Sequence, residues 1–321
     1  MLRYIVRRLL LTLPVLFGIS LIAFIIIYLA PGDFLDRFRL IGMPAEQIEA
    51  LESKFGLDQP FIVQYGRWLK QVVSGSLGVS WGFGQPVTEI IWSRVVFTLV
   101  MGLTSLIISW GIAIPMGIYV AKHQYSFRSQ SFSFLSFLGM SLPEFFLAYV
   151  WYYITSLTLL LPSTGVKSPT YIYMNFSEKV VDRALHLIPP IFILVIPRIG
   201  PIMRMMRGQF LEGLNKDYVH FARAKGLPEK IVIRKHVLRN AINPIITNFG
   251  FAFSAILSGS IFVEVIFNLP GLGSLAYNSF RMQDVFLSMG TVLLSGVMIL
   301  IGNLIADFML AYNDPRVRFN L

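Results

Sequence analysis

Cysteine is absent from this chain of 321 residues, and histidine is scarce. Without cysteine the chain forms no disulfide, no thiolate nucleophile and no cysteine-ligated zinc or iron–sulfur site. The four histidines lie far apart in the sequence, and we expect none to have a carboxylate partner on a shared helix face. The pattern therefore predicts neither a metal site nor histidine-based catalysis. These histidines are His123, His186, His220 and His236.

Charged residues are also few. They make up 14% of the chain, whereas hydrophobic residues make up 55%, and soluble domains carry about 25% charged residues. The mean hydropathy of +0.67 is typical of a membrane protein. A net charge of +10 is compatible with nucleic-acid binding, but basic residues clustered beside apolar runs indicate the positive-inside rule instead. We therefore expect a lipid membrane, and no nucleic acid, as a partner.

The usual catalytic and nucleotide-binding motifs are missing as well. The sequence contains no HExxH, no GxSxG and no GxGxxG after a strand, and Gly165 to Ser168 lacks the spacing of a GxxxxGK[ST] phosphate loop. We expect no catalytic site, no metal and no bound cofactor in this chain. A membrane enzyme would need a nucleophile and a base at matching depth, and neither can be recognised.

What the chain has in abundance is long apolar runs. The first spans roughly 33 Å as a helix, enough to cross a bilayer, and the arginines before it place the N-terminus in the cytosol. A secretion signal is the alternative, but the run is too long and lacks a small-residue exit. Six spans predict an all-α multi-pass membrane protein with both termini cytosolic. They cover residues 9–30, 95–121, 131–161, 184–206, 244–267 and 285–310, before a basic tail at 311–321.

The spans and the segments between them suggest three parts. Residues 1–30 form the N-terminal tail and first span, residues 31–94 an extracytosolic cap, and residues 95–321 a five-helix core with a cytosolic loop at 208–243. In the cap, Pro44 can open an amphipathic helix that Gly56 closes, and Pro60 can open another. The cap is either a solvated cover or a surface that contacts substrate.

Apart from Arg204 and Asp307, which lie near the cytosolic ends of their spans, three charged residues fall within apolar spans. Glu144 follows a proline break in the third span, Arg198 lies in the proline-rich fourth span, and Glu264 lies near the outer end of the fifth. Charges at membrane depth are costly and face a partner or a water-filled path, so both roles stay open for Glu144. The fifth span also carries small residues that either pack closely or line a polar path. These are Ser254, Ala255, Ser258, Gly259 and Ser260.

The stretch from Asp217 to Pro244 is strongly basic and stands out from its apolar surroundings. Asp217 can cap a short helix on which Tyr218, Phe221 and Ala222 share a face. Gly226 suits the left-handed residue that ends this helix, and Pro228 can begin a second one. The pattern predicts a helix, a turn and a second helix on the cytosolic side.

Several motifs in this sequence resemble one family. Residues 218–240 look like the EAA loop of ABC importer permeases, with Ala222, Ala224 and Gly226 in its pattern and Phe221 in place of its leading glutamate. Together, residues 1–319 resemble the first permease subunit of dipeptide, oligopeptide and nickel ABC importers. The other matching stretches are MLRYIVRRLLLTLPVLFGISLIAF, LAPGD, FGLDQPFIVQYGRWL, LSGSIFVEVIFNLPGLG and AYNDPRVRF.

This resemblance implies a type I importer permease fold of six transmembrane helices in a prokaryotic inner membrane. The chain would form half of the pathway for di- or oligopeptides, with a homologous second permease, two ATPase subunits that bind ATP and Mg, and an extracytosolic solute-binding protein. Nickel chelates or oligosaccharides are alternative substrates. A secondary transporter is the alternative class, although the two internal repeats typical of one are not visible. The implied ATPase-coupling residues are Tyr218, Phe221, Ala222, Arg223, Ala224, Lys225, Gly226 and Leu227, and the pathway or gate candidates are Glu144, Arg198 and Glu264.

Overall fold

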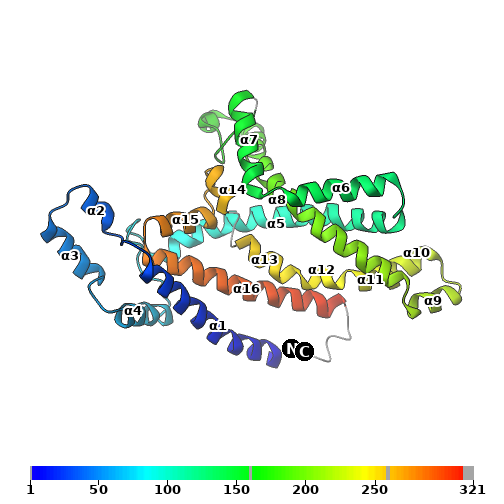
Figure 1. Ribbon diagram of the computed structural model, residues 1–321, viewed down its shortest axis with the longest axis horizontal. Coiled ribbons are helices and arrows are strands. Elements are labelled where there is room, and N and C mark those ends of the chain that lie inside the picture. The colour runs from blue at the N-terminus through cyan, green and yellow to red at the C-terminus, as the bar shows by residue number, and fades with distance from the viewer. Residues whose placement is uncertain (1, 159–160, 258–260, 314–321) are drawn as a thin grey trace. The chain divides into compact units, whose positions relative to one another are not determined.

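The computed structural model describes residues 2–158, 161–257 and 261–313 (Figure 1). Within these ranges the chain is mostly helical, and strand pairing is limited to an isolated bridge between Val79 and Pro86. The all-α class predicted from the apolar runs is therefore confirmed. The basic tail at 314–321 and the small residues at 258–260 lie outside the described residues.

Two compact units interleave along the sequence. The first, which we call the N-terminal unit, combines Leu2–Thr98 with Pro270–Met298. The second, the central unit, combines Leu99–Leu269 with the chain from Ile299 onwards. Two helices, α5 (Val87–Lys122) and α16 (Val285–Asn313), belong partly to one unit and partly to the other.

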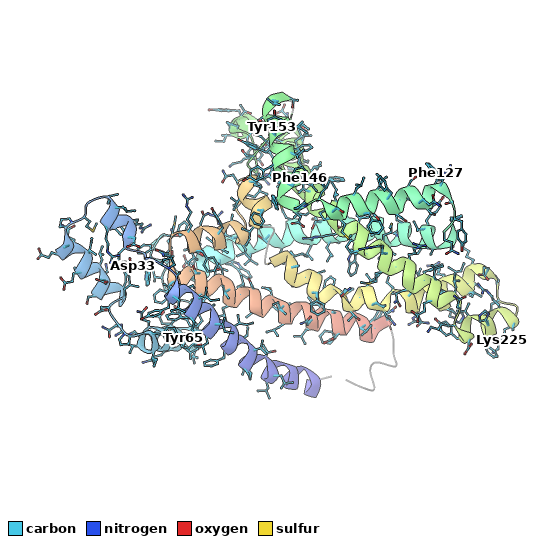
Figure 2. All side chains as sticks on the ribbon, viewed as in Figure 1. Asp33, Tyr65, Phe127, Phe146, Tyr153 and Lys225 are labelled. Atoms are coloured by element: carbon cyan, nitrogen blue, oxygen red, sulfur yellow. The ribbon has the colours of Figure 1, made fainter. Side chains whose placement is uncertain are left out.

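The N-terminal unit is built around α1 and α4. Tyr65 and Trp68 of α4 are buried with Phe24 of α1 and Met289 of α16, and Figure 2 shows Tyr65 on α4. The Tyr65 hydroxyl also lies 3.0 Å from Ser20 Oγ, which satisfies the polar end of the buried ring. The complete helices of this unit are α1 (Leu2–Leu29), α2 (Asp36–Leu40), α3 (Ala45–Phe55), α4 (Phe61–Val73) and α15 (Leu272–Arg281).

Proline precedes both of the longer cap helices, and glycine ends the first of them, as predicted. Pro44 precedes α3, and Gly56 ends it in the left-handed conformation at φ +70°. Pro60 precedes α4 in the same way. Because proline fixes φ and has no N–H to leave unpaired, it suits the start of a helix, and glycine accepts the positive φ of the end.

The central unit carries most of the helices. Small residues allow its long helices to pack closely: a Cβ added to Gly200 of α8 would lie 2.7 Å from the Ser136 carbonyl oxygen of α6. The complete elements of this unit are α6 (Phe127–Ser141), α7 (Glu144–Thr158), η1 (Pro169–Tyr173), α8 (Phe176–Leu214), α9 (Asp217–Ala224), α10 (Glu229–Ile231), η2 (Val232–Val237), α11 (Leu238–Ala241), α12 (Asn243–Thr247), α13 (Phe249–Leu257) and α14 (Ile261–Ile266).

Four described helices are long and apolar enough to cross a membrane: the Leu10–Leu29 part of α1, α5, α8 and the Val285–Leu310 part of α16. The predicted third span is not one continuous helix, because α6 and α7 meet at a bend of 89°. Pro143 supplies the break, since proline disfavours helix at the residue before it. The predicted fifth span covers α12, α13 and α14 and includes residues 258–260, which lie outside the described residues, so the count of six remains a prediction.

Candidate functional site

The predicted helix–turn–helix in the loop 208–243 is present as α9, a turn and α10. Gly226 follows α9 with φ +75°. Its N–H donates to the Arg223 carbonyl at 2.9 Å, and the Leu227 N–H donates to the Ala222 carbonyl at 3.3 Å. This pair of bonds is a Schellman motif, which satisfies the last carbonyls of a helix and requires a left-handed residue. Lys225 lies at this turn (Figure 2).

The start of α9 differs from the prediction. Lys216 occupies the N-cap position without a side-chain capping bond, and Asp217 lies within the first turn. The carboxylate of Asp217 therefore has a favourable position near the positive end of the helix dipole but does not cap it. Lys216 instead forms a 2.8 Å ion pair with Glu212 at the end of α8.

The two faces of α9 have different surroundings. Val219 and Ala222 are buried in a hydrophobic cluster with Ala121 of α5 and with Met206 and Phe210 of α8. The predicted shared face of Tyr218, Phe221 and Ala222 is therefore wrong. The small side chain of Ala222 lets the backbone of α9 approach the long helices.

The opposite side of α9 exposes apolar side chains. Phe221 is 62% exposed, and Tyr218 and Leu227 remain more than a third exposed. The ammonium of Lys225 lies 4.5 Å from the centre of the Phe221 ring, a cation–π contact. We call Tyr218 and Phe221 of α9, together with Leu227 of the following turn, the exposed edge of α9. A single exposed apolar residue is normal on a protein surface. Here three such residues lie close together in the sequence, on α9 and on the turn that the Schellman motif holds.

Arg223 forms an ion pair with a carboxylate of the same chain. Its Nε and guanidinium nitrogens donate to the two oxygens of Glu229 at 3.1 and 2.7 Å. This fork links α9 to α10 across the turn. The hydrogen bond from Arg223 holds the pKa of Glu229 below its usual range, and the same bond raises the pKa of Arg223. Arg223 is thus neutralised within the chain.

The second helix changes its hydrogen-bonding geometry after one turn. Pro228 precedes α10, as predicted, but the chain becomes π-helical in η2 before returning to α-helix in α11. Val232 and Val237 lie five residues apart and are both fully buried. A π-helix joins residues i and i+5, so it brings these two valines to the same face. No sequence signal used above predicts this change of helix type.

Two of the three charges predicted at membrane depth come together in the central unit. Arg198 Nε of α8 lies 4.0 Å from a carboxylate oxygen of Glu144, and the Arg198 guanidinium donates to Ser105 Oγ of α5 at 3.2 Å. Glu144 is the first residue of α7 after the bend, where the helix dipole favours a carboxylate. Glu144 thus has a partner on a neighbouring helix, one of the two roles left open for it.

Glu264 occupies a different element of the same unit. It lies on α14 and is only 5% exposed. Helix α14 packs against α7, with the rings of Phe262 and Phe145 5.7 Å apart. The third predicted charge is therefore buried close in the fold to the helix that Glu144 begins.

Two buried carboxylates were not predicted from the sequence. Asp182 of α8 accepts hydrogen bonds from the backbone and the hydroxyl of Ser168, and its own carbonyl lies 2.8 Å from His186 Nδ1. The expectation that no histidine has a carboxylate partner on its helix is wrong, because Asp182 lies 3.6 Å from His186 at i,i+4 spacing. In the N-terminal unit, Asp284 is fully buried at the start of α16.

In the described part of the chain, no group of three or more histidine or acidic side chains is arranged to hold a metal ion. The Ser168, Asp182 and His186 cluster does not form a nucleophile–base pair, because the serine hydroxyl binds the carboxylate instead of the imidazole. These contacts secure the segment before α8 to that helix.

Comparison with known proteins identifies the family. Residues 113–319 match the family described as binding-protein-dependent transport system inner membrane component, and residues 1–102 match its N-terminal domain. The oligopeptide transport system permease protein AppB of Bacillus subtilis is 37% identical over 318 residues, which cover 98% of this chain and 99% of AppB. The dipeptide transport system permease protein DppB of Alkalihalophilus pseudofirmus is 32% identical, over 99% of this chain and all of DppB. The chain therefore belongs to the inner-membrane permeases of binding-protein-dependent ABC import systems.

Proposed function

We propose that this permease forms half of the translocation pathway of a di- or oligopeptide importer and that partner ATPases drive it through α9. The observation that carries the coupling role is the contrast between the two sides of α9. Its exposed edge offers Phe221 to a partner, while its buried side is fixed to α5 and α8. An amphipathic helix with an exposed aromatic anchor is suited to a groove on another protein.

The buried side of α9 provides the mechanical link. Val219 and Ala222 pack against Met206 and Phe210 near the end of α8, a helix that continues through the unit to Arg198 and beyond. Because close-packed interfaces transmit displacement instead of absorbing it, a force on α9 moves the end of α8. ATP binding would close the ATPase pair, pull α9 and rock these helices, and hydrolysis would reset them.

The remaining subunits follow from the proposed mechanism. One permease supplies half of the pathway wall, so a homologous second permease completes it. Two ATPase subunits bind ATP and Mg, and an extracytosolic binding protein delivers the solute. We place the chain in a prokaryotic inner membrane with both termini in the cytosol. Glu144, Arg198 and Glu264 are the candidates for pathway or gate electrostatics, since charges at membrane depth often mark such sites.

Peptides are the proposed substrate class because AppB and DppB are named as oligopeptide and dipeptide permeases. Nickel chelates and oligosaccharides are the alternatives within the same importer class. Uptake of a labelled dipeptide and a labelled hexapeptide into proteoliposomes containing the full importer and its binding protein tests this choice. Competition by a nickel chelate or an oligosaccharide, with no competition by unlabelled peptide, would contradict the peptide proposal.

Phe221→Ser tests the role of the exposed edge. The side chain is mostly exposed in the isolated chain, so its loss leaves the fold intact. Loss of an aromatic anchor costs about 2 kcal/mol or more of binding, so ATPase affinity should fall roughly 30-fold. Co-purification of the ATPases with the permease and peptide uptake measure the effect.

The matched control for this variant is Tyr173→Ser. Tyr173 is an aromatic residue that is even more exposed, but it lies in η1, in a segment expected on the opposite side of the membrane. This variant should keep its ATPases. If Phe221→Ser retains wild-type ATPase binding and uptake, α9 is not the coupling helix.

A further inference from the structure

A basic groove runs along the second helix of the loop and is independent of the exposed edge of α9. It has a volume of about 840 Å³ and lies between α10, η2 and α11 on one side and the end of α16 on the other. Its cations are Lys230, Arg234, Lys235 and Arg239, and all four side chains are exposed. The described residues that line the groove include no acidic side chain.

Apolar side chains line the same groove. Ile231, Leu238 and Ile242 lie among the cations. The opposite face of this helical segment is buried, with Val232 and Val237 fully enclosed in the hydrophobic core. The groove therefore combines positive charge with apolar surface on a helix face that points away from the core of its own unit.

The two walls of the groove are tied together. Arg239 Nε donates to the Asn313 carbonyl at 3.0 Å, and Asn313 Nδ2 donates to the Arg239 carbonyl at 2.8 Å. The Asn313 amide also binds the side chain of Asn243. In contrast to Arg223, which Glu229 neutralises, Lys230, Arg234 and Lys235 take part in no ion pair within the described chain.

The end of α16 brings a candidate membrane span beside the groove. This helix ends at Asn313, and Tyr312, 82% exposed, lies in the groove wall one residue before that end. An exposed tyrosine at the end of a membrane span suits the level of the lipid headgroups. Tyrosine is enriched at this level because its ring is apolar and its hydroxyl is polar.

We propose that the basic groove binds the headgroup phosphate of an anionic phospholipid. Lys230, Arg234 and Lys235 would surround the phosphate, and an acyl chain would lie along Ile231 and Leu238. Basic pockets beside membrane spans suit such lipids because they supply both the charge and the apolar contact. A soluble acidic protein would match the charge but would leave the apolar residues at headgroup depth without lipid. The proposal does not rest on the coupling role of α9.

The test uses the full-length permease in nanodiscs of phosphatidylcholine with 0–30% phosphatidylglycerol. Native mass spectrometry after release counts the phosphatidylglycerol molecules that stay bound. Wild-type protein should retain phosphatidylglycerol in preference to phosphatidylcholine. The double variant Arg234→Gln/Lys235→Gln should lose roughly 30-fold in apparent affinity, since each surface cation contributes about 1 kcal/mol to binding an anionic lipid.

The control removes two positive charges elsewhere. Lys54→Gln/Lys70→Gln changes α3 and α4 of the N-terminal unit and should keep the lipid preference. Equal retention by wild type and by Arg234→Gln/Lys235→Gln would overturn the proposal. Full competition by millimolar inorganic phosphate would overturn it in favour of a free-anion site. Unchanged lipid retention together with loss of ATPase co-purification would overturn it in favour of a protein contact.

Discussion

Gly226 holds a backbone conformation that few other residues adopt. Its φ of +75° ends α9 and reverses the chain toward α10. A Cβ added at this position would meet no atom within 4 Å. The requirement for glycine is therefore one of backbone conformation and not of space.

Gly226→Val should abolish uptake while leaving membrane insertion intact. A β-branched residue in the left-handed region costs about 1–3 kcal/mol, which favours an alternative turn and displaces α9. Uncoupled ATP hydrolysis, measured beside uptake in proteoliposomes, reports the displacement.

Gly226→Asn is the matched control, because asparagine tolerates the left-handed conformation better than other non-glycine residues. It should keep most of the uptake. Wild-type transport by Gly226→Val would show that the geometry of this turn is not required. Equal loss in both variants would point to a role for glycine other than its backbone freedom.

At the residue scale, the sequence predicted those features that the local backbone conformation decides. Gly226 and Pro228 were assigned correctly because φ preferences act within a few residues. The orientation of Ala222 was not assigned correctly, and the pairing of Arg223 was not predicted, because both depend on neighbours. Ala222 faces α5 and α8, and Arg223 meets Glu229 only after the turn has closed.

At the scale of elements, α16 owes its start to a buried carboxylate. Asp284 accepts a capping bond from the Leu287 N–H at 3.1 Å. Its other oxygen accepts bonds from Ser80 Oγ at 2.5 Å and the Gly82 N–H at 2.9 Å. One side chain thus caps a membrane span and fastens the loop that precedes α5.

Asp284→Asn should destabilise the N-terminal unit. The amide nitrogen would face one of the donors that the carboxylate satisfies, and an unsatisfied buried polar group costs about 1–3 kcal/mol. The melting temperature of the purified permease should fall. Asp58→Asn, a change on an exposed residue of the same unit, should leave it unchanged. Equal melting temperatures for both variants would contradict the role of Asp284.

Helix boundaries were more predictable than helix continuity. Pro44 and Gly56 defined the two ends of α3, and Pro60 the start of α4, because each acts on its own backbone. The break at Pro143 was recognised as a proline effect, but its 89° angle was not predicted, because the path of α7 after the break depends on its packing partners. The π-helical turn of η2 likewise follows from the burial of Val232 and Val237.

At the scale of the whole molecule, the absence of cysteine offers a direct test of topology. A single introduced cysteine is the only thiol in the chain. Lys225 and Ile172 are both exposed positions within the central unit. We expect Lys225 on the cytosolic side and Ile172 on the outer side, as the positive-inside rule requires.

In spheroplasts, a membrane-impermeant maleimide should label Ile172→Cys but not Lys225→Cys. Labelling of Lys225→Cys should appear once the membrane is permeabilised. Wild-type protein, which has no thiol, measures the background. The reverse pattern would invert the proposed topology and would place the exposed edge of α9 out of reach of cytosolic ATPases.

The sequence by itself determined the helical class, the membrane environment and the family, because composition, long apolar runs and local motifs are properties of the linear chain. It also located the loop at 208–243 and its glycine. Only the tertiary structure decided which face of α9 is buried, that Glu144 lies beside Arg198, and that four cations and the end of α16 form a groove. These features join residues far apart in the sequence, and their geometry is decided by packing that no local pattern encodes.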